Sequence, residues 1–590
     1  MALFTPSESP AVVVKEVDLT GGVPNVQSTT GAFVGNFRWG PVEQRTLIAN
    51  EQGLIDTFAT PDTSNNRNIE FTSATQFLKY SNALQVVRAI DGSAKNSAAT
   101  IGQTSTYKST SGYSTPVVKN KATFDAQLSA LDSDKHAFVG RFPGELGNSL
   151  KVSICPPSTN DSDFNNWAFK SSFDGPPSTS TYASNRNGSF DEFHMVVVDN
   201  QGKLTGTKGS VLETYPYVSA ASDAKNTDGS TNFAKDVVNE RSEYVYLVGF
   251  DSNYTADNAG TALTPGTAKV YLSANTTVQD YNFDSGANSG TLGTAQFATG
   301  FDLFEDKDQV EIDFLIAPGM GTRSDQTTVT NDLVATANAR KDCVAVSSPA
   351  RADVVNVTNA ATVTTNITTT ANTFTNSSYL VVDGNYLKIY DKHNDVFVQV
   401  PAASSTAGIM AATDNERAAW FSPAGSRRGQ YFGITAIDYT PTKSQRDTLY
   451  KAGVNPIANI PGQGILLFGD KTKLNRPSAF DRINVRRLFL VLERAIARAA
   501  ESVLFEFNDE FTRAEFVNIV EPVLREVKGR RGITDFRVVC DETNNTAEVI
   551  DRNEFIASIF IKPARSINYV TLNFVAVRTG VDFEEVVGTV

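Results

Sequence analysis

Few residues of this 590-residue chain have the types and spacing needed for catalysis. None of the three histidines stands in an HxxxH or HExxH spacing, so a two-histidine zinc site or a histidine-based triad is not expected. The three cysteines are odd in number and far apart, which predicts neither a disulfide framework nor a CxxC metal site. We interpret all of these as structural or surface residues: His136, His194, His393, Cys155, Cys343 and Cys540.

Two glycine-containing segments are superficially similar to nucleotide-binding loops. Gly464–Thr472 has one residue too many before its lysine and an apolar interior, which favours a buried strand over a phosphate loop. Gly319–Gly321 follows an apolar run, but Ser324 stands where a dinucleotide-binding loop has its third glycine. The acidic run 305–308 lacks the glycine and the final glutamate of a calcium loop. We expect no catalytic, cofactor-binding or metal site, and we do not expect the protein to be an enzyme.

The clearest helix in the sequence is the basic amphipathic segment Asp481–Asp509. On a helical wheel its apolar residues fill one arc and its charged residues fill the opposite arc. The charged arc holds five arginines against Glu493 and Glu501, although the chain carries a net charge of −13. Two interpretations stay open, a solvated helix face or contact with an acidic protein surface. The arginines are Arg482, Arg486, Arg487, Arg494 and Arg498.

Length and composition predict a large globular protein with several domains. The length alone suggests about three to five domains, and 40% hydrophobic residues can form substantial cores. The acidic balance argues against a nucleic-acid binder, which would carry a basic domain or stripe. Because the sequence shows neither a signal-peptide pattern at its start nor a run of about 18 apolar residues, we expect synthesis to end in a cytoplasm, without membrane insertion.

Strands and helices alternate in two parts of the chain. Residues 23–92 contain a strand from Gly31 and a buried strand at Ala83–Ile90, and they are predicted to form the first segment of an α/β domain. Residues 301–350 contain the buried strand Ile312–Ala317, a helix and a second strand. This second segment is predicted to be a βαβ unit with parallel strands.

Stretches rich in Ser, Thr, Asn and Gly separate these parts. Residues 93–300 are predicted to be one or more polar, β-rich outer insertions, and 351–412 a further β-rich insertion that contains a hairpin. Such stretches bury little apolar surface, so we expect them on the outside of the protein and not in its core. Predicted helices and strands follow one another closely again at 413–579, which is predicted to be a compact C-terminal α/β domain.

Both ends of the chain are predicted to be extended arms, 1–22 and 580–590, each with a strand that has no local partner. The backbone groups of such a strand stay unpaired unless they find a sheet edge in this subunit or in another one. The pattern alone allows both arrangements, and strand addition between chains is one of them. The residues concerned are Val12, Val13, Val14, Val17, Val581, Phe583, Val586 and Val587.

Taken in order, several segments resemble the tail sheath proteins of contractile-tailed bacteriophages, the myovirus sheath family. The resemblance is strong over about 415–590, good over 1–92 and near 142–154, and absent from the polar insertions. One segment, FEFND, departs from the Phe-Glu-Pro-Asn form of the family. The segments are SPAVVVKEVD, GAFVGNFRWGPV, FPGELGNSLKVSI, SPAGSRRG, LYKAGVNPI, RINVRRLFLVLERAI, FEFNDEFTR, VVCDETNN and IFIKPARSINYVTLNF.

The resemblance implies a structural and mechanical protein without a cofactor. Its fold would be α/β (α+β) and multidomain, with a compact C-terminal sheath core innermost, inserted β-rich outer domains and extended arms. Subunits would stack as hexameric rings around a tail tube, meet the baseplate and tail terminator proteins, and contract to drive the tube through the host envelope for genome ejection. The alternative is the sheath of a bacteriocin or a secretion-type contractile injection system.

The resemblance also assigns roles to the residues named above. The two terminal strands would add to the core sheets of neighbouring subunits, and the five arginines would face the tube. The protein would belong to the virion and be assembled in the host cytoplasm, with no nucleic-acid partner and no membrane insertion.

Overall fold

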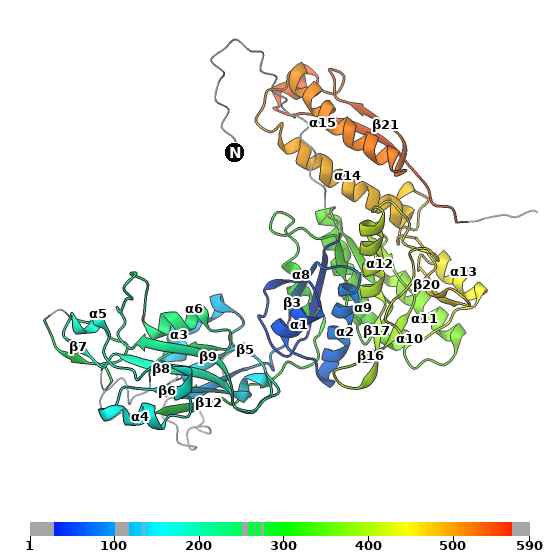
Figure 1. The fold of residues 1–590 in the computed structure, drawn as a ribbon. Coiled ribbons are helices and arrows are strands. Elements are labelled where there is room, and N and C mark those ends of the chain that lie inside the picture. The colour runs from blue at the N-terminus through cyan, green and yellow to red at the C-terminus, as the bar shows by residue number, and fades with distance from the viewer. Residues whose placement is uncertain are drawn as a thin grey trace, which may run out of the picture. The chain divides into compact units, whose positions relative to one another are not determined.

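Figure 1 shows the chain as a computed structural model, which describes residues 29–100, 117–133, 136–250, 258–264, 266–272 and 277–568. The described residues fall into two compact units. The smaller unit holds Trp420–Ser422 and 487–568, and the larger unit holds 29–419 and 423–486. The boundary falls within one helix, α14 (Ile483–Glu501).

The larger unit is built on a six-stranded sheet of order β15–β14–β13–β1–β3–β2. The strands are parallel except for β2, which runs antiparallel to β3. Strands β13 and β14 pair in parallel, and a helix lies between them in the sequence. The predicted βαβ unit is therefore confirmed. The strands are β1 (Gly31–Gly35), β2 (Arg45–Ile48), β3 (Leu84–Arg88), β13 (Phe314–Ile316), β14 (Val344–Ser347) and β15 (Leu380–Val382).

Helices cover both faces of this sheet, which explains why its strands are continuously apolar. On one face Phe297 of α8, Leu333 of α9 and Ile367 of α11 share a core with the sheet. On the other face Phe77 of α2 contacts Phe314 of β13, with ring centroids 6.2 Å apart, and α12 lies beside α2. The helices of this part are α1 (Glu51–Phe58), α2 (Arg67–Leu78), α8 (Thr294–Asp302), α9 (Arg323–Arg340), α10 (Arg351–Val354), α11 (Ala360–Thr373) and α12 (Ala403–Glu416).

The expectation that 351–412 is a β-rich outer insertion is wrong. This segment supplies strand β15 to the main sheet and three helices, α10, α11 and α12. The threonine-rich helix α11 buries Val363, Ile367 and Ala371, which recur every four residues and so lie on one helix face. The segment is therefore part of the core. The hairpin expected within it is present.

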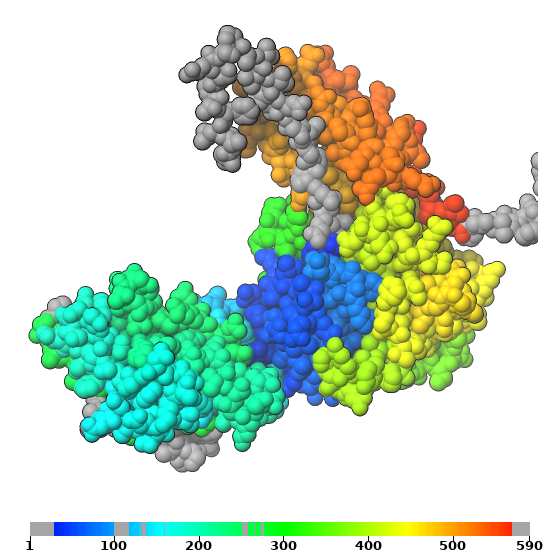
Figure 2. Space-filling model, in the orientation of Figure 1, coloured from blue at the N-terminus to red at the C-terminus, as the bar shows by residue number. Residues whose placement is uncertain are grey.

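The described part of 93–290 forms a β-rich lobe, coloured cyan to green in Figure 2. It has its own apolar core, in which Phe138, Val152, Val197 and Tyr281 are buried. One sheet has the order β12–β6–β8–β9 and another the order β10–β5–β4, both antiparallel. Its elements are β4 (Asn96–Thr100), β5 (His136–Pro143), β6 (Leu150–Cys155), β7 (Gly188–Ser189), β8 (Glu192–Asp199), β9 (Ser210–Ser219), β10 (Val245–Leu247), β11 (Lys269–Val270), β12 (Gln279–Asn282), α3 (Lys121–Ser133), α4 (Ser162–Asn166), α5 (Thr181–Ser184) and α6 (Ala234–Arg241).

The hairpin β16–β17 and the strands that follow it complete the larger unit. Leu387, Val400, Ile457 and Leu467 share one apolar core, which joins the hairpin to β19 and β20. For this reason 423–486 belongs to the larger unit, and the expected single C-terminal domain of 413–579 is not observed. The elements are β16 (Tyr386–Asp391), β17 (Val396–Pro401), β18 (Ala436–Ile437), α13 (Lys443–Lys451), β19 (Ile457–Ile460) and β20 (Gly464–Leu467).

The smaller unit combines part of α14 with α15 (Glu510–Gly529), β21 (Ile533–Val539), α16 (Ala547–Asp551) and β22 (Ser558–Pro563). The buried residues Phe516, Val520 and Leu524 recur every four residues along α15. They form the face of α15 that packs toward β21. Among the described residues, no helix is both long enough and apolar enough to span a membrane.

Candidate assembly surfaces

Among the described residues, the sheet of the smaller unit has two strands and so two edges without a further strand. Strands β21 and β22 pair antiparallel with each other, from Val539 with Ser558 to Ile533 with Pro563, and with no third strand among the described residues. An unpaired edge presents a row of backbone N–H and C=O groups that can accept a further strand. The terminal residues expected to supply such strands lie outside the described residues: Val12, Val13, Val14, Val17, Val581, Phe583, Val586 and Val587.

Four of the five arginines lie in α14, and the fifth lies directly before it. Their surroundings differ. Arg482 precedes the helix, and its Nη1 lies 3.0 Å from the Asp470 Oδ1 and within hydrogen-bond distance of the Tyr450 hydroxyl. These two partners outweigh the effect of burial and raise the pKa of Arg482, so its charge is retained inside the larger unit. Arg482 thus has a structural role in this unit.

Arg486 is stacked between two aromatic rings. Its guanidinium carbon lies 4.3 Å from the ring centroid of Tyr379 and 4.1 Å from that of Phe480, and its Nη1 donates to the Tyr379 hydroxyl at 3.3 Å. Its exposed fraction is 6%, and that of Arg487 is 4%. Arg486 therefore does not lie on an arc open to solvent, because two rings of the larger unit cover its guanidinium group. Arg494 and Arg498 are half-buried.

Sequence reasoning missed the surface formed between α14 and α15. Phe505, Phe507 and Phe511 are almost fully exposed there, and Leu504 is largely exposed. Contiguous exposed apolar side chains of this size mark interaction surfaces in soluble proteins. The sequence carries a signal for this surface, a set of phenylalanines in an otherwise polar stretch.

The residues considered for catalysis have structural surroundings. His194 is buried, its Nε2 lies 2.7 Å from the Gly175 carbonyl oxygen and its Nδ1 accepts from the Tyr217 N–H at 3.1 Å. Burial lowers the pKa of His194, which keeps the ring neutral. The Nε2 atom of His393 lies 3.1 Å from the Oε1 of Glu51, so this side chain ties the β16–β17 hairpin to α1.

The remaining chemical candidates also belong to the framework. Gly464–Leu467 is strand β20, as expected, and Gly319–Gly321 lies in the connection from β13 to α9. Cys155 and Cys343 are buried, and Cys540 is half-buried; all three are free. Among the described residues, no three His, Cys, Asp or Glu side chains are grouped so that they could hold a metal ion.

Comparison with known proteins gives the following matches. Residues 290–473 match the model of the phage tail sheath protein central domain, and 475–576 match the phage tail sheath C-terminal domain. The tail sheath protein of Enterobacteria phage T4 is 33% identical, over 98% of this chain and 99% of its own. That of Vibrio phage KVP40 is 30% identical, again over 98% and 99%. A crystal structure of a sheath tail protein from Listeria innocua covers 91% of this chain and 96% of its own, with 11% identity and a TM-score of 0.51.

Proposed function

Because the chain belongs to the phage tail sheath family, whose members are structural components of phage tails, we propose that it is the mechanical subunit of a contractile phage tail. In this proposal the subunits stack as hexameric rings around the tail tube. Contraction of the rings then drives the tube through the host cell envelope. The observation that carries the proposal is the identity to a phage tail sheath protein along nearly the whole of both chains.

The proposed polymer is held together by strand addition. Within the part of the chain that the structure describes, both edges of the β21–β22 sheet lack a further strand and offer backbone hydrogen-bonding groups. The valine-rich runs Val12–Val17 and Val581–Val587 have the composition of strands that could fill such edges. Arms exchanged between neighbours would keep the subunits linked while the rings move relative to one another during contraction.

The partners follow from the same proposal. A sheath subunit in a tail would contact the tail tube, the baseplate and the tail terminator, and the protein would assemble in the host cytoplasm before becoming part of the virion. We propose Arg494 and Arg498 as the tube-facing candidates, because they remain partly accessible on α14. Arg482, Arg486 and Arg487 are assigned mainly to the framework, given their contacts or burial.

The strand-exchange proposal is tested by removing one arm at a time. Deletion of 1–20 or of 580–590 is expected to abolish polymerisation and leave a soluble, folded monomer, since each deletion removes a donated strand but no described residue. Sedimentation velocity measures the polymer, and circular dichroism with thermal melting checks the fold.

The full-length chain, purified in parallel, is the control for polymerisation. If both shortened chains polymerise at the same protein concentration as the full-length chain, strand exchange does not hold the polymer together and this mechanism is wrong.

A further inference from the structure

The smaller unit carries an exposed aromatic surface with an acidic border, which we name the acidic aromatic patch. The exposed fraction is 84% for Phe507 and 85% for Phe511, and Phe505 is fully exposed. Every charged residue directly beside these rings in the α14–α15 connection is acidic and exposed. The patch consists of Phe505, Phe507, Phe511, Glu501, Glu506, Asp509 and Glu510.

The connection that carries this patch is held in a defined conformation. The Asn508 side chain donates to the Glu554 carbonyl oxygen at 2.8 Å and to the Asn545 Oδ1 at 3.2 Å, and it accepts from Arg513 at 2.9 Å. Phe505 has a φ of +70°, which is rare for a bulky side chain and has to be maintained by its surroundings. A fixed display of aromatic rings suits binding, because less conformational entropy is lost when a partner docks.

A second surface of the same unit has the opposite charge, and we name it the basic sheet patch. Arg537 pairs across the strands with Phe560, and Asp535 pairs with Lys562, so these four side chains share one face of the sheet, and all four are exposed. Asp535 is neutralised by Lys528, whose Nζ lies 3.1 Å from its Oδ1. The patch consists of Phe560, which is 61% exposed, Ile567, which is 83% exposed, and the exposed residues Arg537, Lys562 and Arg565.

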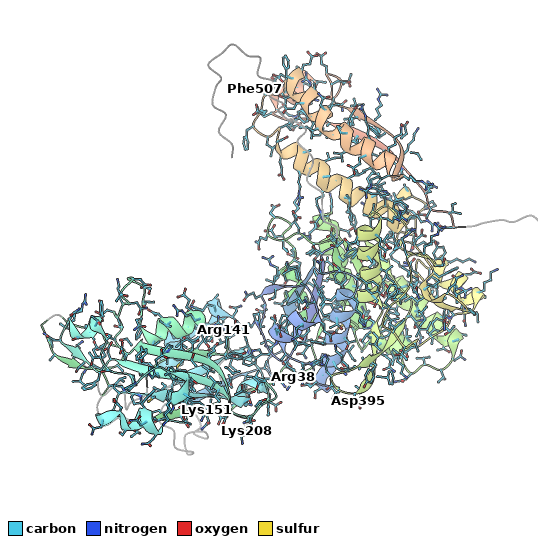
Figure 3. All side chains as sticks on the ribbon, viewed as in Figure 1. Arg38, Arg141, Lys151, Lys208, Asp395 and Phe507 are labelled. Carbon is cyan, nitrogen blue, oxygen red and sulfur yellow. The ribbon has the colours of Figure 1, made fainter. Side chains whose placement is uncertain are left out.

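Part of the basic sheet patch, the segment that follows β22, lies at the opposite end of the smaller unit from the acidic aromatic patch. Phe507 lies at one end of the smaller unit, and the segment that leaves β22 lies at the other end (Figures 1 and 3). Helix α15 begins beside the acidic aromatic patch at Glu510 and ends at Gly529. A helix of this length spans about 30 Å. The residues that follow β22 are fixed near its far end, where the Ala564 N–H donates to the Gly532 carbonyl oxygen at 3.0 Å.

We propose that the acidic aromatic patch of one subunit docks on the basic sheet patch of a second copy of this chain, head to tail. Aromatic rings would cover Phe560 and Ile567, while the carboxylates face the arginine and lysine side chains. A head-to-tail contact closes into a ring when its rotation allows. The contact rests on the proposed sheath function and adds to it a side-chain interface within the ring. This interface is separate from strand exchange, because it uses the face of the β21–β22 sheet and not its edges.

Charge reversal on each patch tests this contact in the full-length chain. One variant combines Glu501→Lys with Glu506→Lys, and the other combines Arg537→Glu with Lys562→Glu. Each variant alone is expected to form polymer only at a protein concentration roughly tenfold or more above that of the unsubstituted chain, because like charges would face each other. An equimolar mixture is expected to regain polymerisation, since each reversed patch then meets a partner of opposite charge.

Three controls make the outcome decisive. Lys208→Glu, an exposed reversal in the β-rich lobe (Figure 3), is expected to polymerise as the unsubstituted chain does. Thermal melting of each variant separates loss of contact from loss of fold, and Phe507→Ser should weaken polymerisation without lowering the melting temperature. The proposed contact is wrong if both reversed variants polymerise at the same concentration as the unsubstituted chain. It is also wrong if both variants are folded and their mixture still does not polymerise. Absence of polymer from the unsubstituted chain overturns the proposed function and the contact together.

Discussion

Glu70 lies in α2 near the carboxyl end of β1, where the Asn36 N–H donates a hydrogen bond to its Oε2. The side chain is buried. Burial raises the pKa of Glu70 to about 8, although the hydrogen bond from Asn36 and the nearby Arg67 act in the opposite direction. The folded protein therefore keeps this carboxyl protonated at a pH at which the unfolded chain loses the proton.

Stability should depend on pH through this residue. Below its ordinary pKa of 4.5 Glu70 is protonated in both states, and no destabilisation arises. Between pH 4.5 and about 8 only the unfolded state releases the proton, so the free energy of unfolding falls as the pH rises. Glu70→Gln removes this dependence, and we expect it to stabilise the protein by about 2 to 4 kcal/mol at pH 8 and by little at pH 5.

Chemical denaturation of the variant and the unsubstituted chain at several pH values measures this difference. Glu240→Gln, which alters an exposed glutamate, serves as the matched control. A stability difference for Glu70→Gln that stays the same from pH 5 to pH 8 would show that the carboxyl is not held protonated in the folded state.

The arginines of α14 show what the sequence could and could not predict for single residues. The wheel placed Arg486 and Arg487 opposite the apolar arc, which follows from the helix period alone. It could not predict that Tyr379 and Phe480 lie against Arg486, because Tyr379 comes from a distant part of the chain and Phe480 precedes the helix and is not on the wheel. The exposed rings of Phe505, Phe507 and Phe511 were missed for the same reason, since hydrophobicity predicts burial and gives no sign of which apolar residues the fold leaves outside.

At the scale of elements, α11 tests whether the threonine-rich segment belongs to the core. Ile367 is fully buried in the core shared by α8, α9 and the main sheet. Ile367→Ala would remove buried methyl groups and leave a cavity, so we expect the free energy of unfolding to fall by about 2 to 5 kcal/mol. Equilibrium unfolding in denaturant measures the change.

Thr369, two residues further along α11, is exposed and provides the control. Thr369→Ala should change stability by less than about 0.5 kcal/mol. Equal, small effects of the two substitutions would indicate a surface segment, as the composition alone suggested.

Most individual elements followed from local sequence patterns. The predicted strands at Ala83–Ile90 and Ile312–Ala317 correspond to β3 and β13, because apolar β-branched runs between turn residues are specific signals. Helix α11 was missed because threonine has a modest helix propensity and its apolar stripe has few members. The division of the chain at α14 could not be predicted either, since a domain boundary depends on which cores the flanking segments join.

At the scale of the whole molecule, the fold separates support from assembly. The larger unit has a doubly covered sheet and a β-rich lobe, each with its own apolar core. The smaller unit has an open-edged sheet and two charged, partly apolar patches that we assign to contacts between subunits. In the proposed sheath, the smaller units and the arms would keep the subunits connected while the larger units change their mutual positions.

Electron microscopy of the purified full-length chain in negative stain tests this account most directly. If the protein is the subunit of a tail sheath, it should polymerise by itself into hollow cylinders with regular transverse striations, one for each ring. Particles that stay monomeric, or aggregate without periodic order, at protein concentrations where the chain is folded would contradict it.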